Sequence, residues 1–376
     1  MTFADTYSGR RVLVTGHTGF KGAWLAEWLG ALGAEVTGYA LPAPTTPSLF
    51  AALDLERRVR HVEGDVRDLD RLTAQLAAAR PSIVFHLAAQ AIVRASYARP
   101  HETFETNVMG TVNVLEAARA CDSVEAVIVV TSDKSYQNLE TGRPFRESDA
   151  MGGRDPYSAS KGAAELVVEA YRQSFFTDGA AVASVRAGNV IGAGDWAPDR
   201  IIPDTVRAVA AGQPVLVRNP DAVRPWQHVL EPLSGYLWLG ARLLADGHSF
   251  EGPWNFGPAD IAGDRSDRSV RWVVEAFLEA WGAGSWTTPD DGARHPHEAH
   301  HLALDSAKAR ERLGWAPVWD AQTAVRRTAA WYAAHHADPT TARALLDAQL
   351  AAYQDDARKA GLPWAMPTPE PGATNP

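Results

Sequence analysis

The most informative segment of the chain reads Arg11-Val12-Leu13-Val14-Thr15-Gly16-His17-Thr18-Gly19-Phe20-Lys21-Gly22. Its beginning is a short apolar run that leads directly into glycines, as a buried parallel strand does. The glycines permit a tight turn, close approach of the backbone to a pyrophosphate, and close packing of the next helix on the strand. The N-terminus of that helix offers free N–H groups and a positive dipole end. The segment therefore predicts a dinucleotide-binding turn.

Apolar patterns after this turn alternate between helices and strands. Residues 25–32 carry leucine and tryptophan with helical spacing, and 35–39 follows as a strand. Further strands are expected at 60–63, 83–87, 126–131 and 181–186, and helices at 68–79, 105–119 and 156–176. This alternation predicts an α/β fold, a doubly wound parallel sheet of the Rossmann-like type with helices on both faces.

The pattern changes near residue 186, where Gly and Pro become frequent and the segments shorten. We expect residues 1–185 to form the dinucleotide-binding domain. Residues 186–360 are expected to form mainly a smaller, mixed C-terminal lobe that binds substrate, with segments that return to the first domain. Residues 361–376 are rich in Pro and small residues, which predicts a flexible tail.

Composition excludes several classes of function. The net charge of -9 argues against a nucleic-acid surface and gives no reason to expect an anionic membrane partner. The apolar runs are too short to span a bilayer, and residues 1–10 lack the pattern of a secretion signal. The single cysteine, Cys121, excludes an internal disulfide, so we expect a cytoplasmic protein.

A tyrosine and a lysine lie one turn apart at the start of a predicted helix. Asp155 and Pro156 are typical of an N-cap and a first helical position, so Tyr157 and Lys161 share one helix face. A nearby ammonium favours the tyrosinate and makes the phenol a usable base. Alone, such a pair is common on helices. Together with the glycine turn, it predicts oxidation of an alcohol by a nicotinamide cofactor.

An acid and an amine follow a predicted strand, in the segment Thr131-Ser132-Asp133-Lys134. This is the edge of the sheet where ligands bind in such folds. Ser132 is placed to hydrogen-bond the reacting hydroxyl beside Tyr157. Taken singly, Asp133 is a turn residue and Lys134 a solvated charge. Beside a nicotinamide site they are better explained as an acid–base pair, which an elimination of water needs and an oxidation alone does not.

The choice between NAD and NADP is open from the residues alone. The second strand ends Thr37-Gly38-Tyr39-Ala40, without the acidic residue that holds the ribose in NAD enzymes and without an arginine in its place. Asp65 is a candidate for the adenine amino group, with a solvated turn residue as the alternative.

The chain resembles the nucleotide-sugar 4,6-dehydratases of the extended short-chain dehydrogenase family, most closely the branch that uses CDP-glucose. The G-x-x-G-x-x-G spacing fits that family. The matching segments are VTGHTGFKGAWL (14–25), VFHLAAQ (84–90), TSDKSY (131–136), AMGGRDPYSASKG (150–162), RAGNVIGAGDW (186–196), RNPDAVRPWQHVLEPLSGYL (218–237), WNFGP (254–258) and HPHEAH (295–300). Lys134 discriminates between branches, because the related dTDP-glucose enzymes carry Glu there.

The resemblance implies a mechanism. Tyr157, helped by Lys161 and Ser132, removes the proton of the C4 hydroxyl as NAD takes the C4 hydride. Lys134 is the candidate base for the C5 proton, which requires a neutral amine. Asp133, protonated, donates to the departing C6 hydroxyl. The hydride then returns to C6, which leaves a 4-keto-6-deoxy sugar and regenerates NAD.

Binding residues are expected on both lobes. Gln90 and Asn189 are substrate contacts by family position. Arg218 and Arg224 are candidates to grip the diphosphate, because guanidinium pairs with phosphate in a bidentate manner, and a surface salt bridge is an equal alternative for Arg218. The resemblance also suggests a homodimer through the helices at 105–119 and 156–176. The expected cofactor contacts are Gly16, Thr18, Gly19, Phe20, Gly22, Asp65, Val66, Leu87, Ala88, Ala89, Asn107, Thr131, Tyr157 and Lys161.

Other readings of the chain rank lower. His297-Glu298-Ala299-His300-His301 fits the H-E-x-x-H zinc pattern, but Pro296 precedes it and that chemistry needs a helix, so no metal site is expected. A dehydratase of another nucleotide hexose and a nucleotide-sugar 4-epimerase share the glycines and the Tyr–Lys pair, although an epimerase has no use for Asp133 and Lys134. A non-catalytic NAD-binding protein would need none of these groups.

Overall fold

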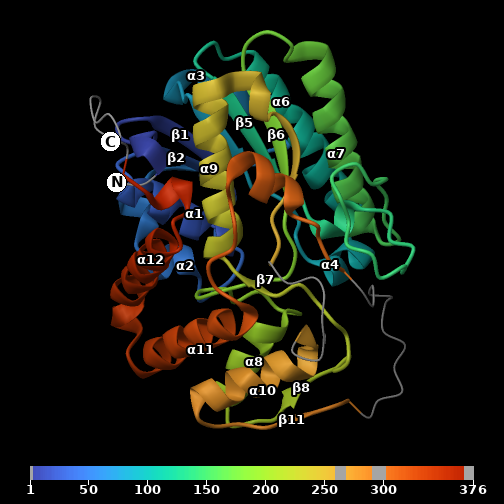
Figure 1. The fold of residues 1–376 in the computed structure, drawn as a ribbon, viewed down its shortest axis with the longest axis vertical. Helices are drawn as coiled ribbons and strands as arrows, with labels where there is room; N and C mark the ends of the chain where they lie inside the picture. Colours follow the sequence, from blue (N-terminus) through green and yellow to red (C-terminus); the bar gives the residue numbers. More distant parts are fainter. Residues whose placement is uncertain (1–2, 259–267, 290–301, 368–376) are drawn as a thin grey trace, which may run out of the picture.

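The computed structural model describes residues 3–258, 268–289 and 302–367. Its centre is a parallel sheet in the order β10-β6-β5-β4-β1-β2-β3 (Figure 1). The strands are β1 (Arg11–Thr15), β2 (Glu35–Ala40), β3 (Arg60–Glu63), β4 (Ile83–His86), β5 (Ala126–Val130), β6 (Ala181–Arg186) and β10 (Gly252–Asn255). The order runs outward in two directions from β1 and β4, so the predicted doubly wound parallel sheet is confirmed.

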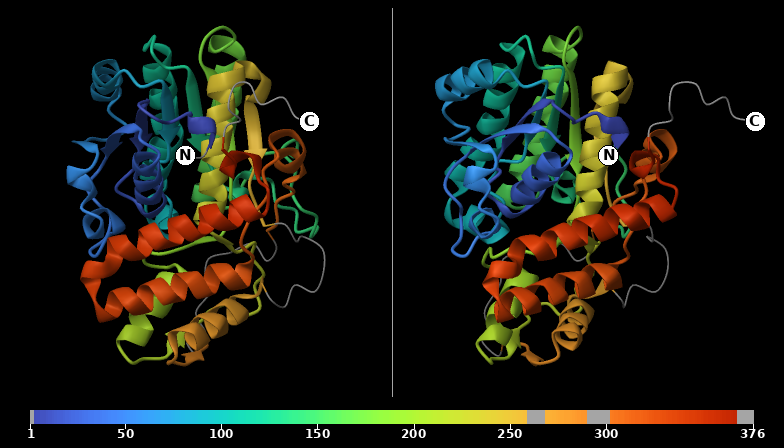
Figure 2. Two further views of the ribbon diagram at one scale, coloured as in Figure 1. Left: turned by 60° about the vertical axis from the view of Figure 1, so that its left-hand side comes forward. Right: turned by 90° about the vertical axis from the view of Figure 1, so that its left-hand side faces the viewer.

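Helices cover both faces of the sheet, as the alternation predicted (Figures 1 and 2). One face carries α3 (Leu69–Ala79), α6 (Gly110–Arg119) and α7 (Pro156–Phe175), and the other carries α1 (Phe20–Ala31) and α9 (Leu230–Asp246). Strand β1 shows why both layers form. Its Val12 and Val14 are buried in one hydrophobic cluster, while Leu13 is buried in the other. A strand whose side chains are apolar on both faces must be covered on both sides.

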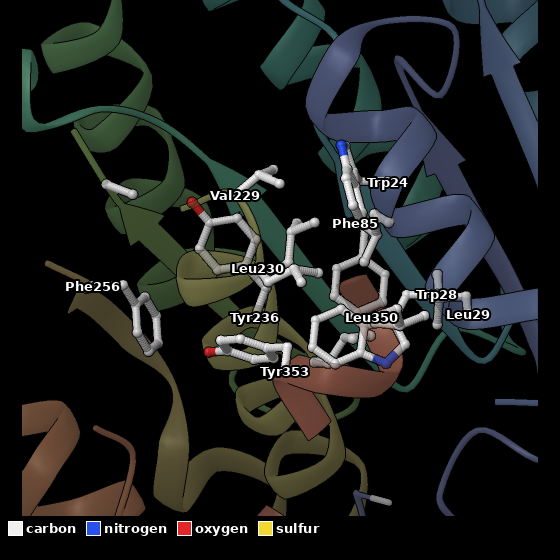
Figure 3. Packing of buried hydrophobic residues seen from close by; sticks show 14 of the residues in the cluster. Trp24, Trp28, Leu29, Phe85, Val229, Leu230, Tyr236, Phe256, Leu350 and Tyr353 are labelled. Atoms are coloured by element: carbon white, nitrogen blue, oxygen red, sulfur yellow. The ribbon is translucent and has the colours of Figure 1, made fainter. Parts of the chain in front are cut away.

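The C-terminal part of the chain is packed against the first helix of the fold. Figure 3 shows Trp28 of α1 close to Leu350 and Tyr353 of α12 (Ala342–Lys359). The Trp28 and Tyr353 ring centroids are 6.0 Å apart with an edge-to-face geometry. Trp364 is also buried and stacks on Phe3 with centroids 5.0 Å apart. The predicted tail is therefore packed at its beginning, while residues 368–376 lie outside the described residues.

The second lobe lies below the carboxyl edge of the sheet in Figure 1. The chain passes between the lobes more than once, because β10 and α9 follow residue 186 and yet belong to the sheet layer. The H-E-x-x-H segment at 297–301, where no metal site is expected, lies outside the described residues. Across 3–258, 268–289 and 302–367, no helix is long and apolar enough to cross a bilayer. The lobe contains β7 (Val190–Ile191), α8 (Ile201–Ala210), β8 (Val215–Leu216), β9 (Gln227–His228), α10 (Val270–Trp281), β11 (Trp286–Thr287) and α11 (Ala321–Ala337).

Shorter helices complete the first lobe. The segment after β4 forms α4 (Val93–Ala98) and α5 (Pro100–Phe104), which continues through a wide helical turn, Glu105–Met109, into α6. The sequence pattern predicted one helix over 105–119, and the structure divides it between that turn and α6. Helix α2 (Leu49–Ala52) follows β2.

Candidate active site

In the glycine turn between β1 and α1, no side chains cover the backbone at the glycine positions. Gly16 has φ +77°, and a Cβ there would lie 2.7 Å from the Ala88 nitrogen. A Cβ on Gly22 would overlap the Gly16 carbonyl oxygen. Helix α1 has Gly19 as its N-cap, with no side-chain cap on its first N–H groups. These groups remain available to an anion, so the turn fits the diphosphate of a dinucleotide.

The end of β4 lies beside this turn. The Leu87 and Ala88 N–H groups both donate to the Thr15 hydroxyl, each at 3.2 Å. The Asn107 side chain donates to the Gln90 carbonyl at 3.0 Å and to the Ser160 hydroxyl at 2.8 Å. The structure thus brings most of the expected cofactor contacts to one edge of the sheet. Asn107 stabilises this edge of the sheet through its hydrogen bonds to Gln90 and Ser160.

Three expected cofactor contacts have protein partners of their own. The Thr18 hydroxyl donates to the Leu41 carbonyl at 2.9 Å. The Thr131 hydroxyl donates to Glu165. Partial burial raises the pKa of Asp65, but hydrogen bonds from Arg67 outweigh it and hold the pKa below its usual range. Arg67 also forms an ion pair with Asp65 at 2.6 Å, so the role of Asp65 toward adenine stays a prediction.

The predicted acid lies in a single helical turn, Asp133–Ser135, at the end of β5. Ser132 caps this turn, donates its hydroxyl to Asp133 Oδ1 at 3.0 Å and accepts the Lys134 N–H at 3.2 Å. The Asp133 residue is only 2% exposed. A Cβ on Gly188 would overlap the Asp133 carboxyl, so only glycine at that position leaves room for the acid.

The predicted Tyr–Lys pair begins α7 as expected. Asp155 caps the helix by accepting the Ser158 N–H at 2.9 Å, with Pro156 as the first helical residue. Lys161 Nζ donates to the Val130 carbonyl at 3.2 Å, and burial lowers its pKa to about 8. Burial also raises the pKa of Tyr157, although the hydrogen bond with Ser132 partly opposes this effect. In this arrangement burial, rather than the Lys161 ammonium, dominates the pKa of the phenol.

Several buried polar atoms near Asp133 lack a hydrogen-bond partner within the described part of the chain. They are Asp133 Oδ2, Asn189 Oδ1, Gln227 Oε1 and the Tyr236 hydroxyl. Asn189 adopts φ +43°, a conformation that asparagine tolerates better than most residues. An unpaired buried polar atom costs about 1–3 kcal/mol. A polar ligand that donates and accepts hydrogen bonds would remove this cost, so the region is a candidate binding site for one.

The sequence interpretation missed three residues of this site. Lys21 lies 5.8 Å from the ring centroid of Tyr236, and burial lowers its pKa to about 7, with Arg200 and Lys161 adding to the effect and Asp133 opposing it. Arg200 forms an ion pair with Asp195 at 2.9 Å. Only Lys21 carried a signal, since it lies inside the glycine turn itself. Tyr236 and Arg200 reach the site only through the tertiary fold.

The four expected substrate contacts have different surroundings. Asn189 lies next to Gly188, which touches the acid. Gln90 is turned inward, where its amide donates to the Thr103 hydroxyl at 3.0 Å. Arg218 forms an ion pair with Asp199 at 3.4 Å, and Arg224 is buried and donates to the Val223 carbonyl at 2.9 Å. The substrate roles of all four stay predictions.

The chain is similar to dehydratases of nucleotide sugars over most of its length. A family model described as GDP-mannose 4,6 dehydratase matches residues 13–328. The CDP-glucose 4,6-dehydratase of Salmonella typhimurium is 50% identical over 335 residues, which cover 87% of this chain and 92% of that protein. The dTDP-glucose 4,6-dehydratase of Mycolicibacterium smegmatis is 30% identical and covers 92% of this chain and 99% of its own length.

Solved structures agree with these sequence relatives. The dTDP-glucose 4,6-dehydratase of Streptomyces venezuelae, solved with NAD bound, has a TM-score of 0.74 and 26% identity to this chain. The match covers 88% of this chain and 99% of that one. The resemblance inferred from the motifs is thereby confirmed. The chain belongs to the GDP-mannose 4,6 dehydratase family, within the extended short-chain dehydrogenases.

Proposed function

We propose that the chain is an NAD-dependent hydro-lyase that converts CDP-glucose to CDP-4-keto-6-deoxyglucose and water. The observation that carries the proposal is the buried Asp133 carboxyl, hydrogen-bonded to Ser132 and with its second oxygen unpaired. An enzyme that only oxidises or inverts C4 has no use for an acid there. Bound NAD supplies the acceptor for the C4 hydride and its donor to C6.

The residues of the chain divide the proton transfers between them. Tyr157 takes the proton of the C4 hydroxyl, which Ser132 holds by a hydrogen bond. The resulting ketone acidifies C5, and Lys134 removes the C5 proton. Asp133 gives its proton to the C6 hydroxyl, which leaves as water. After hydride returns to C6, Lys134 gives a proton back to C5 and is neutral again. Tyr157 ends protonated and Asp133 ionised, so one proton must pass from Tyr157 through solvent to Asp133 before the next turnover.

The position of Lys134 supports its proposed role. It lies in the same helical turn as Asp133 and lines a cavity together with Arg154 and Asp155. Lys134 is thus partly accessible, whereas Asp133 is buried. This division suits a base that exchanges protons with solvent and an acid that meets the substrate away from water.

The preference for a cytidine nucleotide is supported by the 50% identity to the Salmonella typhimurium enzyme and by Lys134. Incubation with CDP-, dTDP-, UDP- and GDP-glucose in separate reactions tests it. We expect formation of the 4-keto product to be at least about tenfold more efficient, in kcat/KM, with CDP-glucose. Equal or greater efficiency with dTDP-glucose would assign the chain to another branch.

The proposal also includes a homodimer, which would form through exposed apolar side chains on α5, the turn after it and α7. Phe104, Met109 and Leu166 are 39%, 49% and 62% exposed and lie on α5, the following turn and α7, which contact one another. Exposed apolar side chains grouped on adjacent helices favour a protein partner. Leu166→Glu is expected to convert a dimer to a monomer in light-scattering measurements, whereas Leu216→Glu, at an equally exposed leucine of the second lobe, should not. A monomeric parent protein would contradict this part.

The same proposal assigns the enzyme to the cytoplasm. The buried thiol of Cys121, with no second cysteine in the sequence, suits a reducing compartment. Activity recovered in the cytosolic fraction of lysed cells would agree, and recovery from an exported or membrane fraction would not.

A further inference from the structure

A buried ion pair lies behind the active site, between Glu165 of α7 and Arg186 of β6. Their side chains are 3% and 4% exposed. The guanidinium donates from Nε to Oε1 at 2.9 Å and from Nη2 to Oε2 at 2.7 Å, a bidentate fork. None of the proton transfers described above uses either group.

The carboxylate end of this pair holds the strand that leads into the acid. The Glu165 oxygens accept the hydroxyls of Thr131 and, at 2.7 Å, of Ser184. Thr131 immediately precedes Ser132, the residue that bonds both Asp133 and Tyr157. One end of the acid–base segment is thus tied to α7 through a single carboxylate.

The guanidinium end holds the other side of the same segment. Arg186 Nη1 donates to the Tyr136 hydroxyl at 2.6 Å, and that hydroxyl donates to Asn255 Oδ1 at 2.7 Å. The Tyr136 ring stacks on Phe145 with centroids 4.8 Å apart. Tyr136 follows Lys134 by only one intervening residue. The short segment that carries the acid and the amine is therefore anchored before and after by one ion pair.

We propose that Glu165 and Arg186 are positioning residues that hold Asp133 and Lys134 in register with Tyr157. Tyr157, Lys161 and Glu165 follow one another at helical spacing on α7. The Glu165 carboxylate therefore fixes the segment that carries Asp133 and Lys134 to the same helix that carries Tyr157 and Lys161. Stability alone does not explain such a pair, because well-packed apolar residues often serve a core equally well. The directional hydrogen bonds of this pair to Thr131 and Tyr136 are explained by a positioning role. The inference rests on the proposed function.

Loosening one anchor should separate the two halves of the reaction. Tyr157 and Lys161 are fixed by α7 and remain in place, so oxidation at C4 should fall less than elimination, although Ser132 lies in the loosened segment. Asp133 and Lys134 lose their register, and small misplacements of reacting groups cost about a hundredfold in rate. The reduced cofactor should then accumulate during turnover, because its hydride cannot return to C6 until water has left.

Tyr136→Phe is the most direct test. The change keeps the ring stacked on Phe145 and removes only the hydroxyl that Arg186 and Asn255 use. With CDP-glucose and NAD, we expect turnover to fall about tenfold to a hundredfold while the near-ultraviolet absorbance of reduced nicotinamide rises above that of the parent enzyme. Tyr7→Phe is the matched control, since that buried hydroxyl donates to the Leu237 carbonyl at 2.7 Å, away from this segment. It should change neither quantity.

Thr131→Val loosens the other anchor with almost no change of shape, and it should give the same accumulation. A fall of oxidation and elimination in equal proportion in both variants, or no change in the reduced cofactor, would show that the pair serves only the fold and would overturn the inference. Failure of the proposed function is a different result. In that case the parent enzyme itself forms no 4-keto-6-deoxy sugar from CDP-glucose.

Discussion

Asp133→Asn is expected to stop the loss of water almost completely while the protein still binds NAD and still oxidises C4. The amide has nearly the shape of the acid, so it fits the space that Gly188 leaves and keeps the bond to Ser132. It has no proton to give to the departing C6 hydroxyl. Loss of a general acid lowers a rate by about 10²–10⁴-fold.

The measurement separates hydride transfer from elimination. Asp133→Asn mixed with CDP-glucose and NAD should show reduced nicotinamide that persists, and chromatography should show little 4-keto-6-deoxy product. Asp246→Asn, at an exposed carboxylate near the end of α9, is the control and should behave as the parent enzyme does. Full dehydration by Asp133→Asn would remove this residue as the acid.

Tyr157→Phe should have the opposite signature. The phenol is the only group in the proposed mechanism that takes the C4 hydroxyl proton, so its removal should slow oxidation by about 10²–10⁴-fold. The reduced cofactor should not appear at any stage, although Ser132 and Asp133 remain in place. NAD affinity should change little, because the glycine turn is untouched.

Rapid mixing with substrate checks this prediction. Parent enzyme should show a transient of reduced nicotinamide, Tyr157→Phe none, and Tyr7→Phe the parent behaviour. A normal transient in Tyr157→Phe would mean that another residue takes the proton. Lys21 would then be the first candidate, because its amine is buried beside Tyr236 and its pKa is lowered to about 7.

The parts of the fold that the sequence predicted are those encoded by neighbouring residues. The strands β1, β3 and β6 have the expected bounds. Strands β1 and β6 are largely apolar, and β1 and β3 are each followed directly by a glycine. The start of α7 was also predicted, since the Asp155–Pro156 cap is local. Ser132, Asp133 and Tyr157 were found together because each lies at the end of a strand or the start of a helix, where chain order alone places it at the binding edge.

Features that depend on distant contacts could not be predicted in this way. No local pattern distinguishes Gly188 from other glycines, and only the fold shows that it makes room for the acid. Glu165 lies on a helix and Arg186 ends a strand, and neither pattern indicates that they meet. The packed start of the tail was missed because its proline-rich composition outweighed one residue, Trp364, which the core buries.

The central claim is that oxidation at C4 leads to elimination across C5 and C6, and one isotope measurement tests it most directly. Parent enzyme, NAD and CDP-glucose are incubated in deuterated water, and the sugar product is examined by nuclear magnetic resonance. We predict a 4-keto-6-deoxy sugar with solvent deuterium at C5, because the proton that Lys134 returns to C5 exchanges with solvent. A product inverted at C4 that has kept its C6 hydroxyl would contradict the account and identify an epimerase.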